Sequence, residues 1–153
     1  MAQNEIFFVG CGEYGVLPNG KVDLSSDGFE QACVAAETLA QQYPDIIDNN
    51  VIICGHTKPA CTTAALVSRE IQPSEQILRP HSGLDRIQKL SPEETLANMA
   101  RFIMTLRGQV SDLAPHDERL VVVSYLPLLS AIKMHDKCVD TTAEPGELHV
   151  HSP

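Results

Sequence analysis

The chain has 153 residues, 43% of them hydrophobic, and a mean hydropathy of −0.07. These values are typical of an ordinary globular protein, so neither a disordered chain nor a membrane span is expected. The length suits a single domain over residues 1–153. The formal net charge of −9, with the few basic residues scattered, argues against a nucleic-acid partner because phosphates would be repelled.

The first half of the chain alternates short apolar runs with helical patterns. The expected elements are a strand over 5–9, a loop through Pro18-Asn19-Gly20, a helix from Ser25 or Ser26 to about Gln42, a buried strand over 50–54 and a helix over 59–70. Near-helical spacing predicts that the apolar face of the first helix consists of Phe29, Cys33, Ala36 and Leu39 or Ala40.

The second half continues the alternation. Ser91, Pro92 and Glu94 form a capping box at the start of a helix that should end near residue 107. That helix is expected to bury Leu96, Met99, Phe102, Ile103 and Leu106. The other expected elements are a weak strand over 76–79, a central strand over 120–124, a helix starting near Pro127 and an edge strand over 147–151. This order predicts an α/β three-layer sandwich with a mostly parallel sheet and helices on both faces.

A glycine-rich loop follows the first strand. The run from Gly10 to Gly15 matches G-x-G-x-x-G, a pattern of dinucleotide-binding loops. That mechanism needs the loop to enter a helix at once, and the segment 16–20, with Pro18 and Gly20, would break it. The acidic residue expected after the second strand is also absent, since Cys54 and Gly55 stand there. Nucleotide binding is therefore the weaker interpretation, and a wide turn permitted by the glycines is the stronger one.

The five cysteines do not form a recognisable framework: Cys11, Cys33, Cys54, Cys61 and Cys138. Their number is odd, and the apolar run near the amino terminus is too short for a signal peptide, so a reducing cytoplasm is expected. Cys54, His56 and Cys61 have a spacing that fits no zinc pattern. We therefore expect no metal site and no cofactor, although His149 and His151, alternating on one strand face, could bind a metal adventitiously.

Four segments together resemble the histidine phosphatase superfamily, nearest its short bacterial phosphohistidine phosphatases. Gly10-Cys11-Gly12-Glu13 stands where the family has Arg-His-Gly-Glu after its first strand. The other three segments are 24–32, like the Leu-Thr-x-x-Gly-x-x-Gln-Ala start of the first helix, 54–62, like Ser-Pro-x-x-Arg-Ala-x-x-Thr, and 124–129, like Ser-His-x-Pro. The resemblance spans roughly residues 5–135 and implies a phosphoglycerate mutase-like fold.

The family's phosphate-pocket positions are all altered. They become Gly10 for an arginine, Cys11 for the nucleophilic histidine, Lys58 for an arginine and Tyr125 for the second histidine. A phosphate dianion needs several donors and positive charges, and here only one cation remains. Loss of a nucleophile that acts with its partners can lower kcat ~10⁶-fold, and loss of a phosphate-clamping arginine ~10³–10⁵-fold.

The resemblance therefore implies a catalytically degenerate domain that acts as a binding or regulatory module. A protein partner or a small anionic ligand would occupy the old pocket, with Cys11, Gly12, Lys58 and Tyr125 as contacts. His56, beside Lys58, and His81, in the region where the family brings a loop over the pocket, are further candidates. The alternative is a divergent phosphatase that uses Cys11 as a thiolate nucleophile, which requires nearby positive charge. Tyr125 is expected to plug the vacated space.

Overall fold

A computed structural model describes residues 5–73, 78–80, 94, 97–99, 101–106 and 118–152. Its centre is a five-stranded sheet in the order β5-β4-β6-β1-β7. The strands are β1 (Ile6–Gly10), β4 (Asn50–Cys54), β5 (Leu78–Pro80), β6 (Arg119–Ser124) and β7 (Leu148–His151). Four of them run parallel, and β7 lies antiparallel to β1 at one edge.

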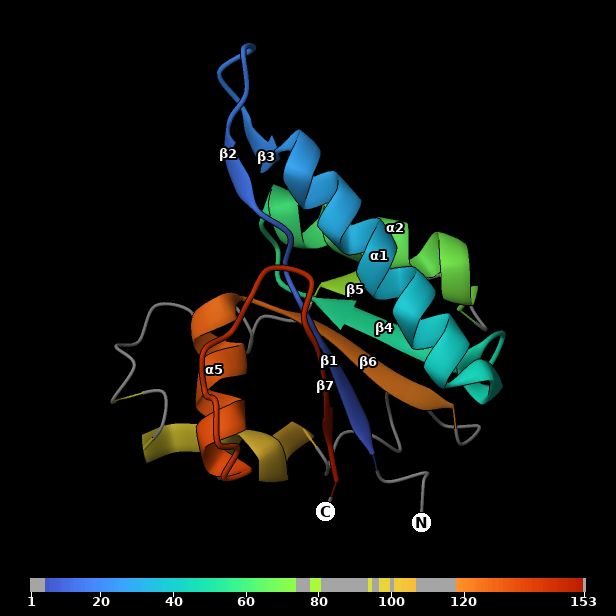
Figure 1. The fold of residues 1–153 in the computed structure, drawn as a ribbon, viewed down its shortest axis with the longest axis vertical. Helices are drawn as coiled ribbons and strands as arrows, with labels where there is room; N and C mark the ends of the chain where they lie inside the picture. Colours follow the sequence, from blue (N-terminus) through green and yellow to red (C-terminus); the bar gives the residue numbers. More distant parts are fainter. Residues whose placement is uncertain are drawn as a thin grey trace.

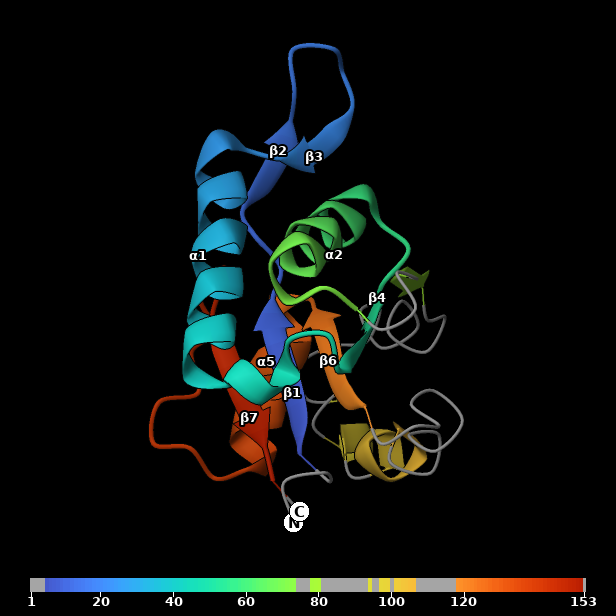
Figure 2. The ribbon, with the colours of Figure 1, turned by 90° about the vertical axis from the view of Figure 1, so that its right-hand side faces the viewer.

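Helices cover both faces of this sheet (Figures 1 and 2). The named helices are α1 (Ser26–Gln42), the 3-10 turn η2 (Pro44–Ile46), α2 (Lys58–Ile71) and α5 (Leu126–His135). Phe7 and Val9 of β1 pack with α1 and α2, whereas Ile6 and Phe8 pack with α5 and the helical residues of 97–106. Because the strand is buried on both faces, its apolar run is continuous. The three-layer sandwich with a mostly parallel sheet is as predicted.

The face that α1 buries includes Ala36 and Leu39 as predicted, but Phe29 is exposed and Cys33 only half-buried. Ser25 caps the helix as expected, its hydroxyl accepting the Gly28 N–H at 3.0 Å. The buried positions are Gly28, Ala32, Ala35, Ala36 and Leu39. Phe29, predicted to be in the core, is 47% exposed. The physical reason is that the stripe of small residues lets α1 pack closely on its neighbours, which turns the bulky Phe29 outward.

A short hairpin takes the place of the predicted loop after β1. It consists of β2 (Tyr14–Val16) and β3 (Val22–Leu24), paired antiparallel, and it projects beyond the sandwich (Figure 2). The turn includes Gly20 with φ of 80°, a conformation that favours glycine. Both strands have three residues and β2 is fully exposed, so no apolar pattern could reveal them.

The remaining elements lie near their predicted positions. Four predicted core residues of the 97–106 segment, Met99, Phe102, Ile103 and Leu106, are buried. The capping box at Ser91 and the predicted core residue Leu96 lie outside the described residues. Within the described part of the chain, no helix combines the length and the apolar character needed to span a bilayer.

Candidate functional site

The carboxyl ends of three strands bring the predicted site residues to one edge of the sheet. Strand β6 lies between β1 and β4, and Gly10 is paired with Ser124 in the parallel register. Cys11 N–H donates to the Ser124 carbonyl at 2.9 Å, which places Cys11 beside the start of Tyr125. Lys58, four residues after the end of β4, is the first residue of α2. The edge is therefore the one on which α/β folds carry their sites.

Tyr125 fills space at this edge. Its side chain is only 4% exposed and belongs to the core that α1 and α2 cover. The ring lies against Gly55: a Cβ atom there would come within 2.2 Å of the tyrosine oxygen and 2.7 Å of Cζ. The hydroxyl is hydrogen-bonded to the Thr57 hydroxyl at 2.8 Å. A glycine after β4 and a threonine before α2 thus pack around the ring of Tyr125, at the position where the sequence resemblance aligns the family's second histidine.

Cys11 is held as a neutral thiol. The side chain is 2% exposed, and Sγ lies 3.7 Å from the Thr63 hydroxyl oxygen. That hydroxyl donates its single hydrogen to the Pro59 carbonyl at 2.9 Å and accepts the Gly12 N–H at 3.2 Å. Cys11 must then be the donor to Thr63, a role that needs the protonated thiol.

The electrostatic surroundings of Cys11 also favour the protonated thiol. Burial raises the pKa of the Cys11 thiol, and the nearby Asp23 carboxylate raises it further. Asp23 is fixed in place by the Thr62 hydroxyl, which donates to it at 2.8 Å. Activated thiolates sit next to positive charge, so this surrounding has the wrong sign for a nucleophile.

A segment near the carboxyl terminus covers Gly10. The Gly10 N–H donates to the Glu147 carbonyl at 2.8 Å, and the Gly146 N–H donates to the Gly10 carbonyl at 3.1 Å. A Cβ atom on Gly10 would lie 2.9 Å from the Glu144 carbonyl oxygen. The segment is anchored by Lys133, whose Nζ donates to Glu147 at 2.6 Å and to the Thr142 carbonyl at 2.7 Å. The arginine that the sequence resemblance aligns with Gly10 would have no room here.

The loop after β1 does not form a dinucleotide site. It continues into β2 and not directly into a helix, so the strand–loop–helix order that a dinucleotide-binding loop needs is not formed here. Gly12 and Gly28 are needed for a different reason: a Cβ on Gly12 would lie 2.5 Å from the Gly28 carbonyl oxygen, and one on Gly28 would lie 1.9 Å from the Glu13 carbonyl oxygen. The pattern that resembled a nucleotide fingerprint allows the loop to pack directly on α1.

The other predicted site residues are Lys58, His56 and His81. His56 and Lys58 are exposed beside the start of α2, and no described contact links Lys58 to Cys11 or Tyr125. His81 lies outside the described residues. The four aligned pocket positions therefore differ in their surroundings. The side chains of Cys11 and Tyr125 are buried, Gly10 is covered by the carboxyl-terminal segment, and Lys58 is exposed.

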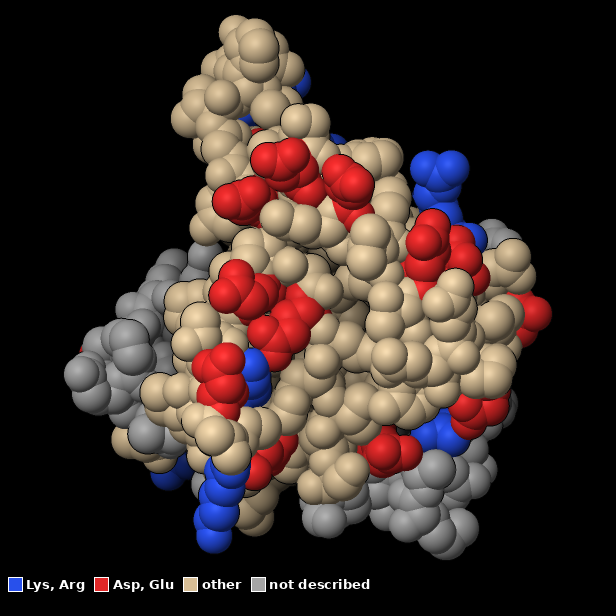
Figure 3. Space-filling model, viewed as in Figure 1, with Lys and Arg blue, Asp and Glu red and all other residues tan. Residues whose placement is uncertain are grey.

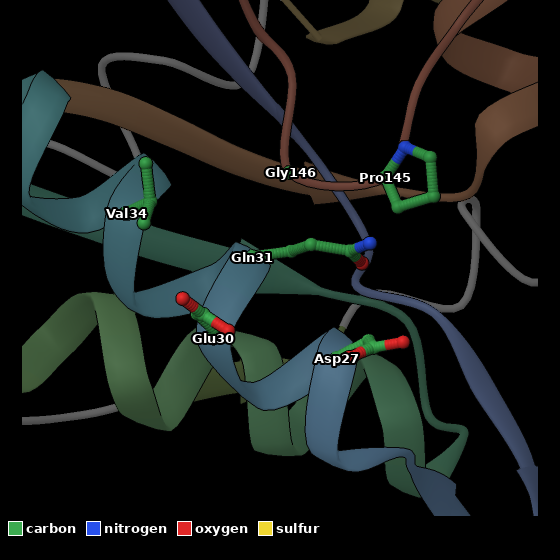
Figure 4. A pocket seen from close by; sticks show the side chains of 6 residues that line it. All are labelled: Asp27, Glu30, Gln31, Val34, Pro145 and Gly146. Atoms are coloured by element: carbon green, nitrogen blue, oxygen red, sulfur yellow. The ribbon is translucent and has the colours of Figure 1, made fainter.

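An acidic pocket that sequence reasoning missed lies at the rim of this edge (Figure 4). It has a volume of about 370 Å³ and is lined by α1 residues Asp27, Glu30, Gln31 and Val34 and by Pro145 and Gly146. Glu13 adjoins it, because its N–H donates to Gln31 Oε1 at 2.9 Å. We call the exposed carboxylates of Glu13, Asp27 and Glu30 the acidic rim. Acidic side chains gather widely on this face of the molecule (Figure 3).

Comparison with known proteins places the fold. No family model and no curated protein matches the sequence. A phosphoglycerate mutase from Bacillus anthracis str. Sterne has a TM-score of 0.68 at 12% identity, over 96% of this chain and 87% of that one. A mutant phosphoserine phosphatase from Entamoeba histolytica, in complex with phosphoserine, has a TM-score of 0.65 at 11% identity, over 95% of this chain and 89% of that one. The chain has the phosphoglycerate mutase-like fold.

A third neighbour is similar in the same way. The protein histidine phosphatase SixA, in complex with tungstate, has a TM-score of 0.57 at 15% identity, over 84% of this chain and 74% of that one. The phosphoglycerate mutase-like fold that the sequence resemblance implied is thus confirmed. At such low identity the likeness concerns the fold, and function has to be argued from the site.

Proposed function

We propose that this chain is a non-catalytic binding module built on the phosphoglycerate mutase-like fold. The observation that carries the proposal is Tyr125, whose buried ring lies against Gly55 and whose hydroxyl pairs with Thr57. The ring occupies the position that a pocket histidine has in the resembling family. A phosphate group needs that volume open and lined with donors, and a buried aromatic ring supplies neither.

The Cys11 thiol supports the same conclusion. A thiol that donates to Thr63 and has a raised pKa is mostly protonated at neutral pH. The reactive form of a cysteine is the thiolate, so the divergent-phosphatase alternative lacks its nucleophile. Hydrolysis by the family route would also lack both arginines, at Gly10 and Lys58.

We expect the purified protein not to hydrolyse phosphohistidine or generic phosphomonoesters above background, since loss of the reacting group alone lowers kcat ~10⁶-fold. The Cys11→Ser variant should give the same trace as the wild type. A turnover that is present in the wild type and absent from Cys11→Ser would overturn the proposal and establish the thiol as a nucleophile. Turnover equal in both proteins would indicate a contaminating phosphatase if further purification removes it, and an unrecognised catalytic site, which would also overturn the proposal, if it persists.

The partner that the surface fits best is a protein segment with basic side chains. The acidic rim borders the pocket between α1 and the turn at Pro145 and Gly146, and its carboxylates are exposed. With a net charge of −9, the chain attracts cationic partners and repels anionic ones over distances of about a Debye length, ~10 Å. Protein recognition at this rim would use charge complementarity rather than phosphate chemistry.

A lysine-rich peptide is expected to bind this rim in calorimetry at low salt. The double variant Asp27→Asn with Glu30→Gln should weaken binding roughly tenfold, because exposed charges contribute about 1 kcal/mol or less each. The matched control is Glu37→Gln with Glu70→Gln, which removes the same charge from a different pocket between α1 and α2. Equal weakening in both double variants would show that only net charge matters and would refute the rim as the binding surface.

A second candidate is a small anionic ligand at the first turn of α2. Lys58 is exposed there, next to the exposed His56, and amide groups at the start of a helix favour anions. The solved neighbours include complexes with phosphoserine and tungstate. Such a ligand would contact Lys58 from outside the filled edge, and the Lys58→Ala variant would lose it.

A further inference from the structure

Three histidines surround one carboxylate at the opposite end of the sheet. His135 and Asp136 lie at the carboxyl end of α5, and His149 and His151 lie on β7. His151 is paired with Ile6, the first residue of β1, whereas Gly10 at the other end of β1 borders the site described above. Figure 1 shows the lower end of α5 close to β7. The cluster is therefore separate from the edge of the sheet that carries Cys11 and Tyr125.

The side chains converge on the two carboxylate oxygens of Asp136 in different ways. Oδ1 lies 3.3 Å from His135 Nδ1 and 2.8 Å from His151 Nδ1. Oδ2 lies 2.7 Å from His149 Nε2 and 3.0 Å from His151 Nδ1, so His151 reaches both oxygens. The ligand atoms of His135, Asp136 and His151 all lie within 4.8 Å of one another. In a tetrahedral zinc site with bonds of about 2.0–2.1 Å, neighbouring ligand atoms lie roughly 3.3 Å apart. Small side-chain shifts would produce that geometry.

We propose that His135, Asp136 and His151 form a binding site for a divalent transition-metal ion, with Zn²⁺ the best-fitting ion. Two imidazole nitrogens and one carboxylate oxygen are a ligand set that zinc accepts, with water in the fourth position. His149 has a supporting role: by donating to Oδ2 it holds the Asp136 carboxylate beside the two other histidines.

The surroundings favour a cation. Asp136 is the residue that ends α5, where the partial negative charge of the helix carbonyl groups gathers. The His135 side chain is 35% exposed, which gives an ion a route from solvent.

The expected role is a structural clip. Strand β7 is the only antiparallel strand of the described sheet and lies at its edge, and the proposed ion would join it to the end of α5. Binding to the folded state alone stabilises that state. The alternation of His149 and His151 along the sequence predicts only an adventitious pair, whereas the proposed site has His149 as a supporting residue and includes His135 and Asp136 from the end of α5.

The experiment is a titration of the full chain with Zn²⁺ after chelator treatment. We expect one ion per chain, and a rise in the thermal midpoint of roughly 5–10 °C when zinc exceeds its dissociation constant about a hundredfold. With Co²⁺, the absorption spectrum should show nitrogen and oxygen ligation without a sulfur-to-cobalt charge-transfer band. No binding, or a spectrum with sulfur ligation, would overturn the proposal.

Variants separate the ligands from the supporting residue. Asp136→Asn and His135→Gln should weaken zinc binding at least a hundredfold, and His149→Gln about tenfold with an unchanged cobalt spectrum. The more exposed His135 keeps the test valid if Asp136→Asn fails to fold. His56→Gln and Cys138→Ser are the matched controls, the first an exposed histidine elsewhere and the second the nearest cysteine in sequence. Binding that survives His135→Gln, or that is lost in Cys138→Ser, would refute the assignment.

Discussion

Replacing Gly28 by alanine is expected to lower the free energy of unfolding by about 3 kcal/mol or more. The added Cβ would lie 1.9 Å from the Glu13 carbonyl oxygen and 2.8 Å from its carbon, so backbone would have to move. Helix propensity alone predicts the opposite sign, a gain of up to about 1 kcal/mol for Gly→Ala within a helix. Destabilisation would therefore show that the packing of the 11–13 loop on α1 outweighs the higher helix propensity of alanine at this position.

Urea denaturation of wild type, Gly28→Ala and Gly15→Ala provides the measurement. Gly15 is the control because a Cβ there meets nothing within 4 Å and its backbone needs no positive φ, so its alanine variant should stay within about 0.5 kcal/mol of wild type. If Gly28→Ala were as stable as Gly15→Ala, the loop and α1 would not be in the contact described.

The Gly55→Ala variant should be destabilised by about 2 kcal/mol because of Tyr125. The new Cβ would lie 2.2 Å from the tyrosine oxygen and 2.8 Å from Cε2, and the buried ring has little freedom to retreat. The ring would also lose its hydrogen bond to Thr57, which contributes about 1 kcal/mol.

A double-mutant cycle isolates this contact. Tyr125→Ala alone should destabilise the chain by about 3 kcal/mol through the cavity that it leaves. In that background Gly55→Ala should have almost no further effect, giving a coupling of about 2 kcal/mol between the two sites. Tyr125→Phe, which keeps the ring, should leave Gly55→Ala destabilising. Additive effects of Gly55→Ala and Tyr125→Ala would mean that the ring does not occupy the space beside Gly55.

The sandwich was predictable because its strands carry a physical signal. Continuous apolar runs at 50–54 and 120–124 require burial on both faces, and helix signals such as Ser25 and Pro127 separate the strands. The one error on α1 arose because Phe29 and the small residues beside it compete for the same face. Hydrophobicity favours the aromatic residue, whereas close packing between helices favours alanine and glycine.

The site was predictable only as a set of positions. Resemblance aligned Cys11, Lys58 and Tyr125 with strand ends, and parallel topology brought them to one edge. The Tyr125 ring has room only because residue 55 is a glycine. A glycine directly after a strand could therefore have indicated that a bulky side chain packs there. The cover over Gly10 and the cluster at Asp136 could not be derived, because they join segments whose contact only the folded chain creates.

A titration of the ¹⁵N-labelled chain with tungstate, followed by NMR, tests most directly whether the phosphate site is closed. The amides of Gly12 and Gly55 report on the space beside Cys11 and Tyr125. We predict that their signals stay unchanged at tungstate concentrations well above those of the protein, while any shifts remain confined to the exposed start of α2 around Lys58. Saturable shifts of Gly12 and Gly55 in wild type would show that an oxyanion enters between these residues, and would contradict the account.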